Sequence, residues 1–210
     1  MTTTERLRQR RIVHRAASLM LCYPEADVLR QLPTIATALQ ALPPDSVTKA
    51  SLTRLLLHLS DTAVDDLQKR YVDVFDLTSK RCLYLSYYTD GDTRRRGAVL
   101  AEFKARYRTS GFLVDTRGEL PDYLPLVLEY AAVADPADGA RILQEYRPSI
   151  ELLRLALLDL NSPYAAALEA VCATLPGPSP TDTAAVMKMA QAGPPREEVG
   201  LEPVAFGAGR

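Results

Sequence analysis

Apolar residues recur every three or four positions through most of this chain, which is the spacing of amphipathic helices. Residues 83–88 alternate partly like a strand, but we expect them to be helical or irregular because a single strand has no partner here. The pattern predicts an all-α fold with a single multi-helix, bundle-like domain. The expected helices cover residues 4–23, 25–42, 46–59, 62–75, 93–110, 123–133, 137–160 and 163–175.

Prolines and capping residues set the expected helix ends. Pro33 should kink or break the second helix, and Pro148 should bend or divide the helix over residues 137–160. Asp45 or Ser46 is placed to accept a hydrogen bond from the first turn of the third helix. Together these signals predict roughly eight or more helices.

The composition changes after Leu175, where prolines and glycines become frequent. We therefore expect a helical domain over residues 1–175 and a flexible tail over residues 176–210. Within the tail, residues 183–192 can form a short-lived helix, and a few apolar residues near the C-terminus can dock as a short clip.

The length, composition and net charge of the chain exclude several classes of protein. A chain of 210 residues with 47% apolar residues can bury a core, and its net charge of −1 argues against a general nucleic-acid binder. No apolar run approaches the ~18 residues of a membrane span, and the N-terminal region reads as a basic amphipathic helix rather than an export leader. The scattered cysteines are typical of reduced thiols, so we expect a cytoplasmic protein with no stable membrane association.

The sequence carries no recognisable catalytic or metal-binding pattern. Its two histidines, His14 and His58, lack the spacing of metal ligands, and it has neither a Gly-x-Ser-x-Gly turn nor a glycine-rich phosphate loop. Cys82 follows Arg81, which could lower the pKa of its thiol, although a packed thiol is the commoner arrangement. We therefore expect no metal, no cofactor and no enzymatic activity.

The stretch from Glu119 to Tyr130 places two prolines four residues apart, before a helical pattern with apolar residues and an acid. Pro121 suits the first turn of a helix, but Pro125 would then lie where that helix needs its N–H. Either the helix begins near Tyr123 or its first turn is distorted. A helix start of this kind, with acids and a tyrosine beside it, suits recognition of a polar or cationic partner.

Two further stretches combine aromatic residues with charge. Tyr71 and Phe75 share one helix face, and Asp76 stands at the helix end, where the helix dipole disfavours an acid without a partner. Tyr87 and Tyr88 precede a turn and an arginine run, which suits binding of a peptide or an anion. The alternatives are that the first two aromatics are core residues and that the arginines form a solvated face.

Together these stretches resemble the NarJ-type chaperones of respiratory nitrate reductase. Residues 71–77, 81–97 and 119–130 carry the resemblance, which is most specific over Leu-Tyr-Leu-Ser-Tyr-Tyr-Thr-Asp-Gly-Asp-Thr-Arg. It implies an all-helical, non-enzymatic member of the wider group of redox-enzyme maturation proteins, which includes the TorD and DmsD types. The sequence departs from the family at Tyr123, where many relatives are expected to carry His.

The resemblance implies a cytoplasmic protein that binds the leader-like N-terminal segment of the catalytic (alpha) subunit of nitrate reductase. Such chaperones hold this client while the molybdenum cofactor is inserted, and they prevent premature docking to the membrane partner. A leader of this kind presents a basic amphipathic helix, which needs an apolar groove with an acidic rim. The residues expected to bind the client peptide are Tyr71, Phe75, Asp76, Tyr87, Tyr88, Leu120, Pro121, Asp122, Tyr123, Leu124, Pro125 and Glu129.

We expect the two helical stretches to face each other, with Asp76, Asp122 and Glu129 as the acidic rim. Asp122 has two open roles, as a charge partner for an arginine of the client or as a cap of the following helix. The competing hypotheses are a general helical peptide-binding adaptor and an enzyme that uses the three acids, and the protein can be a monomer or a dimer. The expected groove residues are Tyr71, Phe75, Leu120, Leu124 and Leu128.

Overall fold

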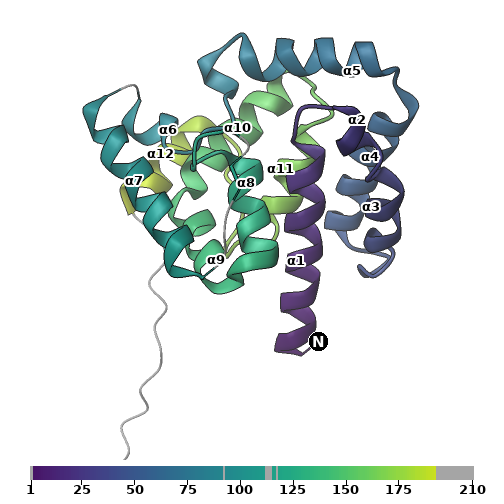
Figure 1. Ribbon diagram of the computed structural model, residues 1–210, viewed down its shortest axis with the longest axis horizontal. Coiled ribbons are helices and arrows are strands. Elements are labelled where there is room, and N and C mark those ends of the chain that lie inside the picture. The colour runs from purple at the N-terminus through teal and green to yellow at the C-terminus, as the bar shows by residue number, and fades with distance from the viewer. Residues whose placement is uncertain (1, 92, 112–114, 117, 193–210) are drawn as a thin grey trace, which may run out of the picture.

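The computed structural model describes residues 2–91, 93–111, 115–116 and 118–192, and the last part of the expected tail, residues 193–210, lies outside them. The described residues fold into helices with one isolated antiparallel bridge, so the expected all-α fold is confirmed (Figure 1). The α-helices are α1 (Thr3–Met20), α2 (Ala26–Leu29), α3 (Leu32–Leu39), α4 (Val47–Asp61), α5 (Val64–Tyr71), α6 (Tyr87–Asp90), α7 (Arg94–Thr109), α8 (Leu124–Glu129), α9 (Pro136–Glu145), α10 (Arg147–Asp159), α11 (Ala165–Cys172) and α12 (Thr183–Ala192). The π-helical turns are η1 (Val72–Asp76) and η3 (Tyr130–Ala134), and η2 (Ser79–Arg81) is a 3₁₀ turn.

Helix α1 runs through the middle of the molecule and contacts α3, α4, α8, α11 and η3 (Figure 1). Its buried face carries Val13, Ala16, Ala17 and Met20, at the three- and four-residue spacing seen in the sequence. Helix α11 is buried along most of its length, and its alanines allow α4 and α10 to approach closely. These two helices therefore form the core around which the others pack.

Both expected proline breaks are confirmed. Pro33 lies in the first turn of α3, after the short helix α2 has ended, and Pro148 lies in the first turn of α10, directly after α9. A proline in a first turn removes no intrahelical hydrogen bond, so each new helix begins where its proline is tolerated. The predicted cap at Ser46 is also confirmed, because its hydroxyl accepts a hydrogen bond from the amide of Lys49 at 3.5 Å.

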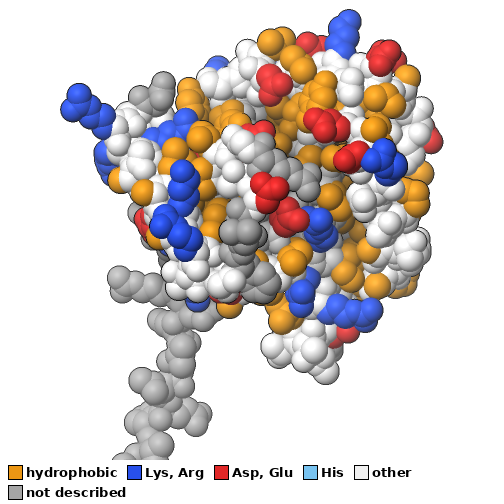
Figure 2. All heavy atoms as spheres, viewed as in Figure 1, with side chains coloured by type: hydrophobic (Ala, Val, Ile, Leu, Met, Phe, Trp, Pro, Cys, Tyr) orange, Lys and Arg blue, Asp and Glu red, His pale blue; other side chains and the backbone are white. Residues whose placement is uncertain are grey.

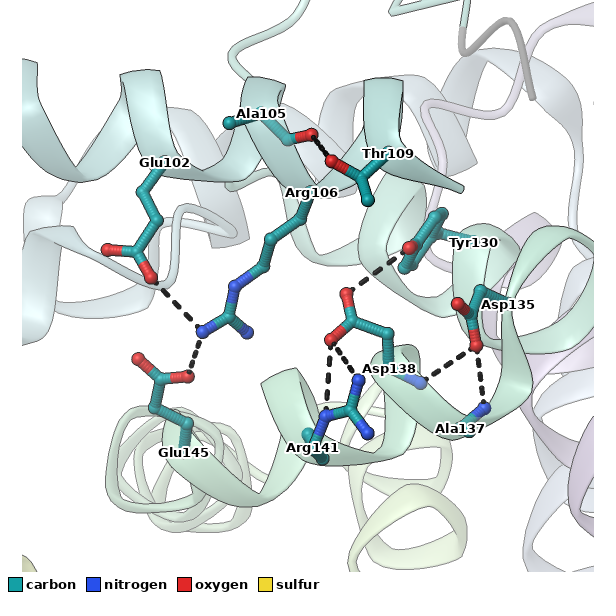
Figure 3. Close-up of polar contacts among 10 residues, drawn as sticks. All are labelled: Glu102, Ala105, Arg106, Thr109, Tyr130, Asp135, Ala137, Asp138, Arg141 and Glu145. Carbon is teal, nitrogen blue, oxygen red and sulfur yellow. Dashed lines mark hydrogen bonds and ion pairs between the residues drawn. The ribbon is translucent and has the colours of Figure 1, made fainter. Parts of the chain in front are cut away.

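Helix α9 is held on two sides. Against η3 it approaches so closely that a Cβ at Gly139 would lie 2.3 Å from the Cα of Ala131, and only glycine avoids that overlap. On its other side Arg106 of α7 donates to Glu145 at 2.9 Å, while also donating to Glu102 of its own helix at 3.1 Å (Figure 3). The charges in this region are thus paired with one another and fix α7 beside α9.

Residues 176–192 pack against α10, beyond the domain boundary expected from the sequence. In α10, the buried carboxylate of Glu151 accepts from Arg154 at 2.6 Å and pairs with Arg147 at 3.4 Å. Arg147 also donates to three backbone carbonyls of this segment, two of them at 3.0 Å. Carbonyls in a proline-rich segment have few backbone N–H groups to pair with. Helix α12 follows where a short-lived helix was expected, and it fully buries Val186.

Within the ranges that the structure describes, no helix combines the length and the hydrophobicity needed to cross a membrane. The same ranges contain no group of three or more His, Cys, Asp or Glu side chains arranged to hold a metal ion.

Candidate functional site

The two stretches expected to face each other are in contact. The hydroxyl of Tyr71, at the end of α5, lies 3.1 Å from the hydroxyl of Tyr123, which precedes α8. Tyr71 also donates to the carbonyl oxygen of Leu21 at 3.0 Å, so Tyr123 is the donor within the tyrosine pair. Burial is the main cause that raises the pKa of both phenols above their ordinary value, and both remain protonated.

The apolar side chains of these stretches form core instead of an open groove. Tyr71 and Phe75 pack against the ring of Tyr164, with centroid distances of 5.9 and 5.1 Å. Leu120 is 38% exposed and is the one expected groove residue that solvent reaches. Helical spacing shows which residues share a face but not whether another element covers that face, which is why the expected groove is wrong. Its four buried members are Tyr71, Phe75, Leu124 and Leu128.

Asp122 is fully buried, so its expected place on an exposed acidic rim is wrong. Its Oδ2 accepts hydrogen bonds from the backbone amide of Ser86 at 3.1 Å and from the hydroxyl of Ser86 at 2.6 Å. The guanidinium of Arg96 lies 3.7 Å away and also donates to the Ser86 hydroxyl at 3.3 Å. Asp122 does not cap α8 either, because its carboxylate bonds to the stretch before α6.

The strand-like residues 83–88 do have a partner, which is the turn before α8. Tyr84 and Tyr123 form the antiparallel bridge, flanked by backbone hydrogen bonds of 2.7 and 3.1 Å. Helix α8 begins directly after Tyr123 with Pro125 in its first turn, so the alternative of a helix start near Tyr123 is the correct one. Pro121 lies ahead of the bridge, and both prolines are buried.

The tyrosines after the bridge are engaged by the protein itself. The Tyr88 hydroxyl lies within hydrogen-bonding distance of the Cys82 carbonyl at 3.0 Å and the Lys80 carbonyl at 3.1 Å. The guanidinium of Arg96 lies 5.6 Å from the ring centre of Tyr87, so this arginine stacks on an aromatic face instead of lying in solvent. Burial raises the pKa of the Cys82 thiol, which favours a packed thiol over an activated thiolate.

Glu129 links α8 to α1 through an ion pair with Arg15. The side chains are 45% and 40% exposed, so the pair is accessible but each charge already has a partner. Burial and then the charge of Glu119, rather than that of Glu129, raise the pKa of Asp76. The three acids therefore do not form the expected exposed rim, because Asp122 is buried and Glu129 is paired with Arg15.

An exposed surface does remain beside these stretches, and we call it the acidic-apolar surface. Leu77 is 71% exposed directly after η1, and Leu120 is 38% exposed in the chain segment before the bridge. The Tyr84 hydroxyl donates to Glu119 Oε2 at 2.6 Å, which connects residues 83–88 to the segment before the bridge. The charge of Glu119 in turn acts on Asp76, the last residue of η1. Figure 2 shows acidic side chains interspersed with apolar ones around α5, and this surface begins at the end of η1, the turn that follows that helix. Its residues are Asp76, Leu77, Tyr84, Glu119 and Leu120.

Three of these five residues were not among the expected client-binding residues. Leu77, Tyr84 and Glu119 all lie in the stretches that carry the family resemblance, and each lies outside the expected helices. Their position was the available signal, because residues just outside a buried helical face are the ones left at the surface.

Comparison with known proteins points to one family. Residues 40–170 match the family described as nitrate reductase delta subunit. Over 163 residues the chain is 40% identical to the nitrate reductase-like protein NarX of Mycobacterium tuberculosis, covering 78% of this chain and 24% of that protein. The chain thus spans about a quarter of the length of that relative.

Other relatives match over more of their own length. The protein named "Probable nitrate reductase molybdenum cofactor assembly chaperone NarJ" of Bacillus subtilis is 33% identical over 179 residues, covering 83% of this chain and 92% of the relative. The NarJ chaperone of Escherichia coli is 31% identical over 151 residues, covering 70% of this chain and 63% of the relative.

A solved structure supports the fold. It is described as a "Putative Redox Enzyme Maturation Protein" from Archaeoglobus fulgidus and matches with a TM-score of 0.56 at 18% identity, over 77% of this chain and 90% of that one. The family match covers more than half of the sequence, and the Bacillus relative matches over nearly its whole length. On these grounds the chain belongs to the nitrate reductase delta subunit family.

Proposed function

We propose that this protein is a cytoplasmic, non-enzymatic chaperone dedicated to one nitrate reductase. Family membership supports this, as do relatives whose names describe assembly chaperones for the molybdenum cofactor of nitrate reductase. In this role it binds the leader-like N-terminal segment of the catalytic (alpha) subunit. It holds that subunit while the cofactor is inserted, before the reductase docks on its membrane partner.

The observation that carries the client-binding part of the proposal is the acidic-apolar surface. The exposed side chains of Leu77 and Leu120 offer contact to the apolar face of an amphipathic helix. Asp76 and Glu119 provide negative charge for the basic residues of such a helix. Because Tyr84 donates to one oxygen of Glu119, the other oxygen stays available to a lysine or arginine of the client.

Three residues that were expected to bind the client instead hold this surface in place, namely Tyr71, Asp122 and Tyr123. The hydroxyl pair of Tyr71 and Tyr123 fixes the end of α5 against the turn before α8. The buried bonds from Asp122 to Ser86 fix that same turn against the stretch that carries Tyr84. The two halves of the surface are thus held in place before any client arrives, which lowers the entropic cost of binding.

The test is a calorimetric titration of the full chain with a peptide copying the N-terminal segment of the nitrate reductase catalytic subunit from the same organism. We expect one-to-one binding with a micromolar or lower Kd. Combining Asp76→Asn with Glu119→Gln should weaken binding about tenfold or more, equivalent to ~1.4 kcal/mol. Leu120→Ser should weaken it as well, whereas the exposed control variants Asp159→Asn and Leu160→Ser should leave it unchanged.

Two results would count against the proposal. Binding that is unchanged in folded Asp76→Asn/Glu119→Gln protein would remove the acidic-apolar surface as the client site. Equal affinity for an unrelated basic amphipathic peptide would favour the general peptide-binding adaptor over a chaperone dedicated to nitrate reductase.

A further inference from the structure

A second surface lies on the side of α1 that faces α3 and η3. It is a groove with a volume of about 520 Å³, with Ile12, Leu19 and Ile35 among its lining residues. Two large apolar side chains on its border, Leu7 and Val133, are 40% and 51% exposed. The groove therefore offers apolar contact that the fold itself does not use.

The charge around this groove is opposite to that of the acidic-apolar surface. Arg8, Arg11 and Arg15 all line it, whereas no acidic residue does so within the described part of the chain. The three arginines lie on one face of α1 and span about 10 Å along its axis, or two helical turns. Figure 2 shows basic side chains gathered beside apolar ones over the lower part of α1.

Two of the three arginines are partly engaged. Arg11 donates through Nε to the carbonyl oxygen of Ala132 at 2.7 Å, and Arg15 pairs with Glu129. These contacts fix both guanidinium groups at the border of the groove, where Arg11 keeps donors to spare. No hydrogen bond or ion pair joins Arg8 to the described residues, so its charge is fully available to a partner.

We propose that this arginine-rimmed groove binds an amphipathic helix of a partner protein that carries acidic residues. Apolar side chains at positions i, i+3, i+4 and i+7 of that helix would fill the groove beside Leu7 and Val133. Asp or Glu residues one and two turns apart would reach Arg8, Arg11 and Arg15. The basic leader expected at the acidic-apolar surface would meet like charge here, so the two surfaces bind different segments.

The probe is a labelled, designed helical peptide with leucines on one face and glutamates beside them, added to the full chain and followed by fluorescence anisotropy. A peptide with lysine in place of each glutamate is the matched probe. We expect binding of the acidic peptide that weakens as salt is added, and at least tenfold weaker binding in Arg8→Glu and in Val133→Asp. Arg6→Glu changes the same charge on α1 outside the groove, and Leu160→Asp changes another exposed apolar residue, so both controls should bind normally.

The result that overturns the proposal is acidic-peptide binding that is absent or insensitive to Arg8→Glu, in protein whose circular dichroism is unchanged. A gain in peptide binding on changing Glu197, Glu198 and Glu202 to lysine would also overturn it, because the chain's own C-terminal segment would then be the occupant. Titration with the reductase N-terminal peptide distinguishes this proposal from the proposed function. Arg8→Glu should leave that titration unchanged, whichever way the acidic-peptide result falls.

Discussion

The buried carboxylate of Asp122 accepts two hydrogen bonds from Ser86, one from its amide at 3.1 Å and one from its hydroxyl at 2.6 Å. The two residues lie in different stretches, and their bonds join the segment before α6 to the turn before α8. Arg96 supplies an opposite charge at 3.7 Å. Such a group contributes to stability because its partners would otherwise be buried without hydrogen bonds.

We therefore predict that Asp122→Ala lowers the free energy of unfolding by about 3 kcal/mol, since the change leaves the charge of Arg96 without its carboxylate and the Ser86 amide without its acceptor. Urea unfolding followed by circular dichroism measures this. The exposed control Asp159→Ala should stay within about 0.5 kcal/mol of the unmodified protein. An unfolding midpoint that does not move in Asp122→Ala would contradict the structural role.

The sequence was sufficient to predict the helices, because the spacing of apolar residues and the positions of prolines are local signals. Pro33 and Pro148 mark helix starts wherever the rest of the chain lies. Which other element covers the apolar face of a helix is not determined by local sequence. Tyr71 and Phe75 are buried partly by Tyr164, which lies some ninety residues further along, and no spacing rule connects them. Contact between the two motif stretches could be inferred, but not which of their side chains remain exposed.

The attachment of α12 was missed for a related reason. In a sequence, Glu151 with arginines three and four positions away reads as an ordinary solvated helix face. The structure buries all three charges and directs Arg147 onto carbonyls of residues 176–178. A proline-rich composition by itself predicts a flexible tail. It cannot show that buried arginines elsewhere in the fold donate hydrogen bonds to the carbonyl groups of that segment.

This attachment leads to a second prediction. Arg147→Met removes the donors that hold residues 176–178, so the amides of α12 should exchange with solvent at least tenfold faster. Hydrogen exchange read out by mass spectrometry measures it, with α1 as the internal reference. Arg141→Met, at an exposed arginine on α9, is the matched control and should leave α12 protected. Equal protection of α12 in both variants would rule out the arginine attachment.

The tyrosine pair gives a third prediction. Tyr71→Phe removes a donor from the buried Leu21 carbonyl and an acceptor from Tyr123, so it should lower the free energy of unfolding by about 1–2 kcal/mol. Tyr123→Phe removes a single bond and should cost less. A double-mutant cycle should give a coupling of about 0.5 kcal/mol or more between the two hydroxyls, and strict additivity would show that they do not interact.

The last prediction concerns acid stability and rests on His14. This residue of α1 is 1% exposed, and its Nε2 lies 2.9 Å from the Thr174 hydroxyl. Burial, followed by the charge of Arg10, lowers its pKa from 6.5 to about 3. Its Nδ1 has no hydrogen-bond partner among the described residues, so nothing there favours the imidazolium form.

The direction of the pH dependence follows from the difference in proton binding between the folded and unfolded states. In the unfolded chain His14 regains an ordinary pKa, so between pH 6.5 and about 3 the unfolded state binds more protons than the folded one. The stability that depends on neutral His14 is complete above pH 6.5 and decreases progressively as the pH falls toward 3. We expect the urea midpoint to fall between pH 7 and pH 5, and His14→Gln, which cannot titrate, to flatten that fall. His58→Gln, at a much less buried histidine, should retain most of the slope. A His14→Gln variant with the full slope of the unmodified protein would assign the acid sensitivity to other groups.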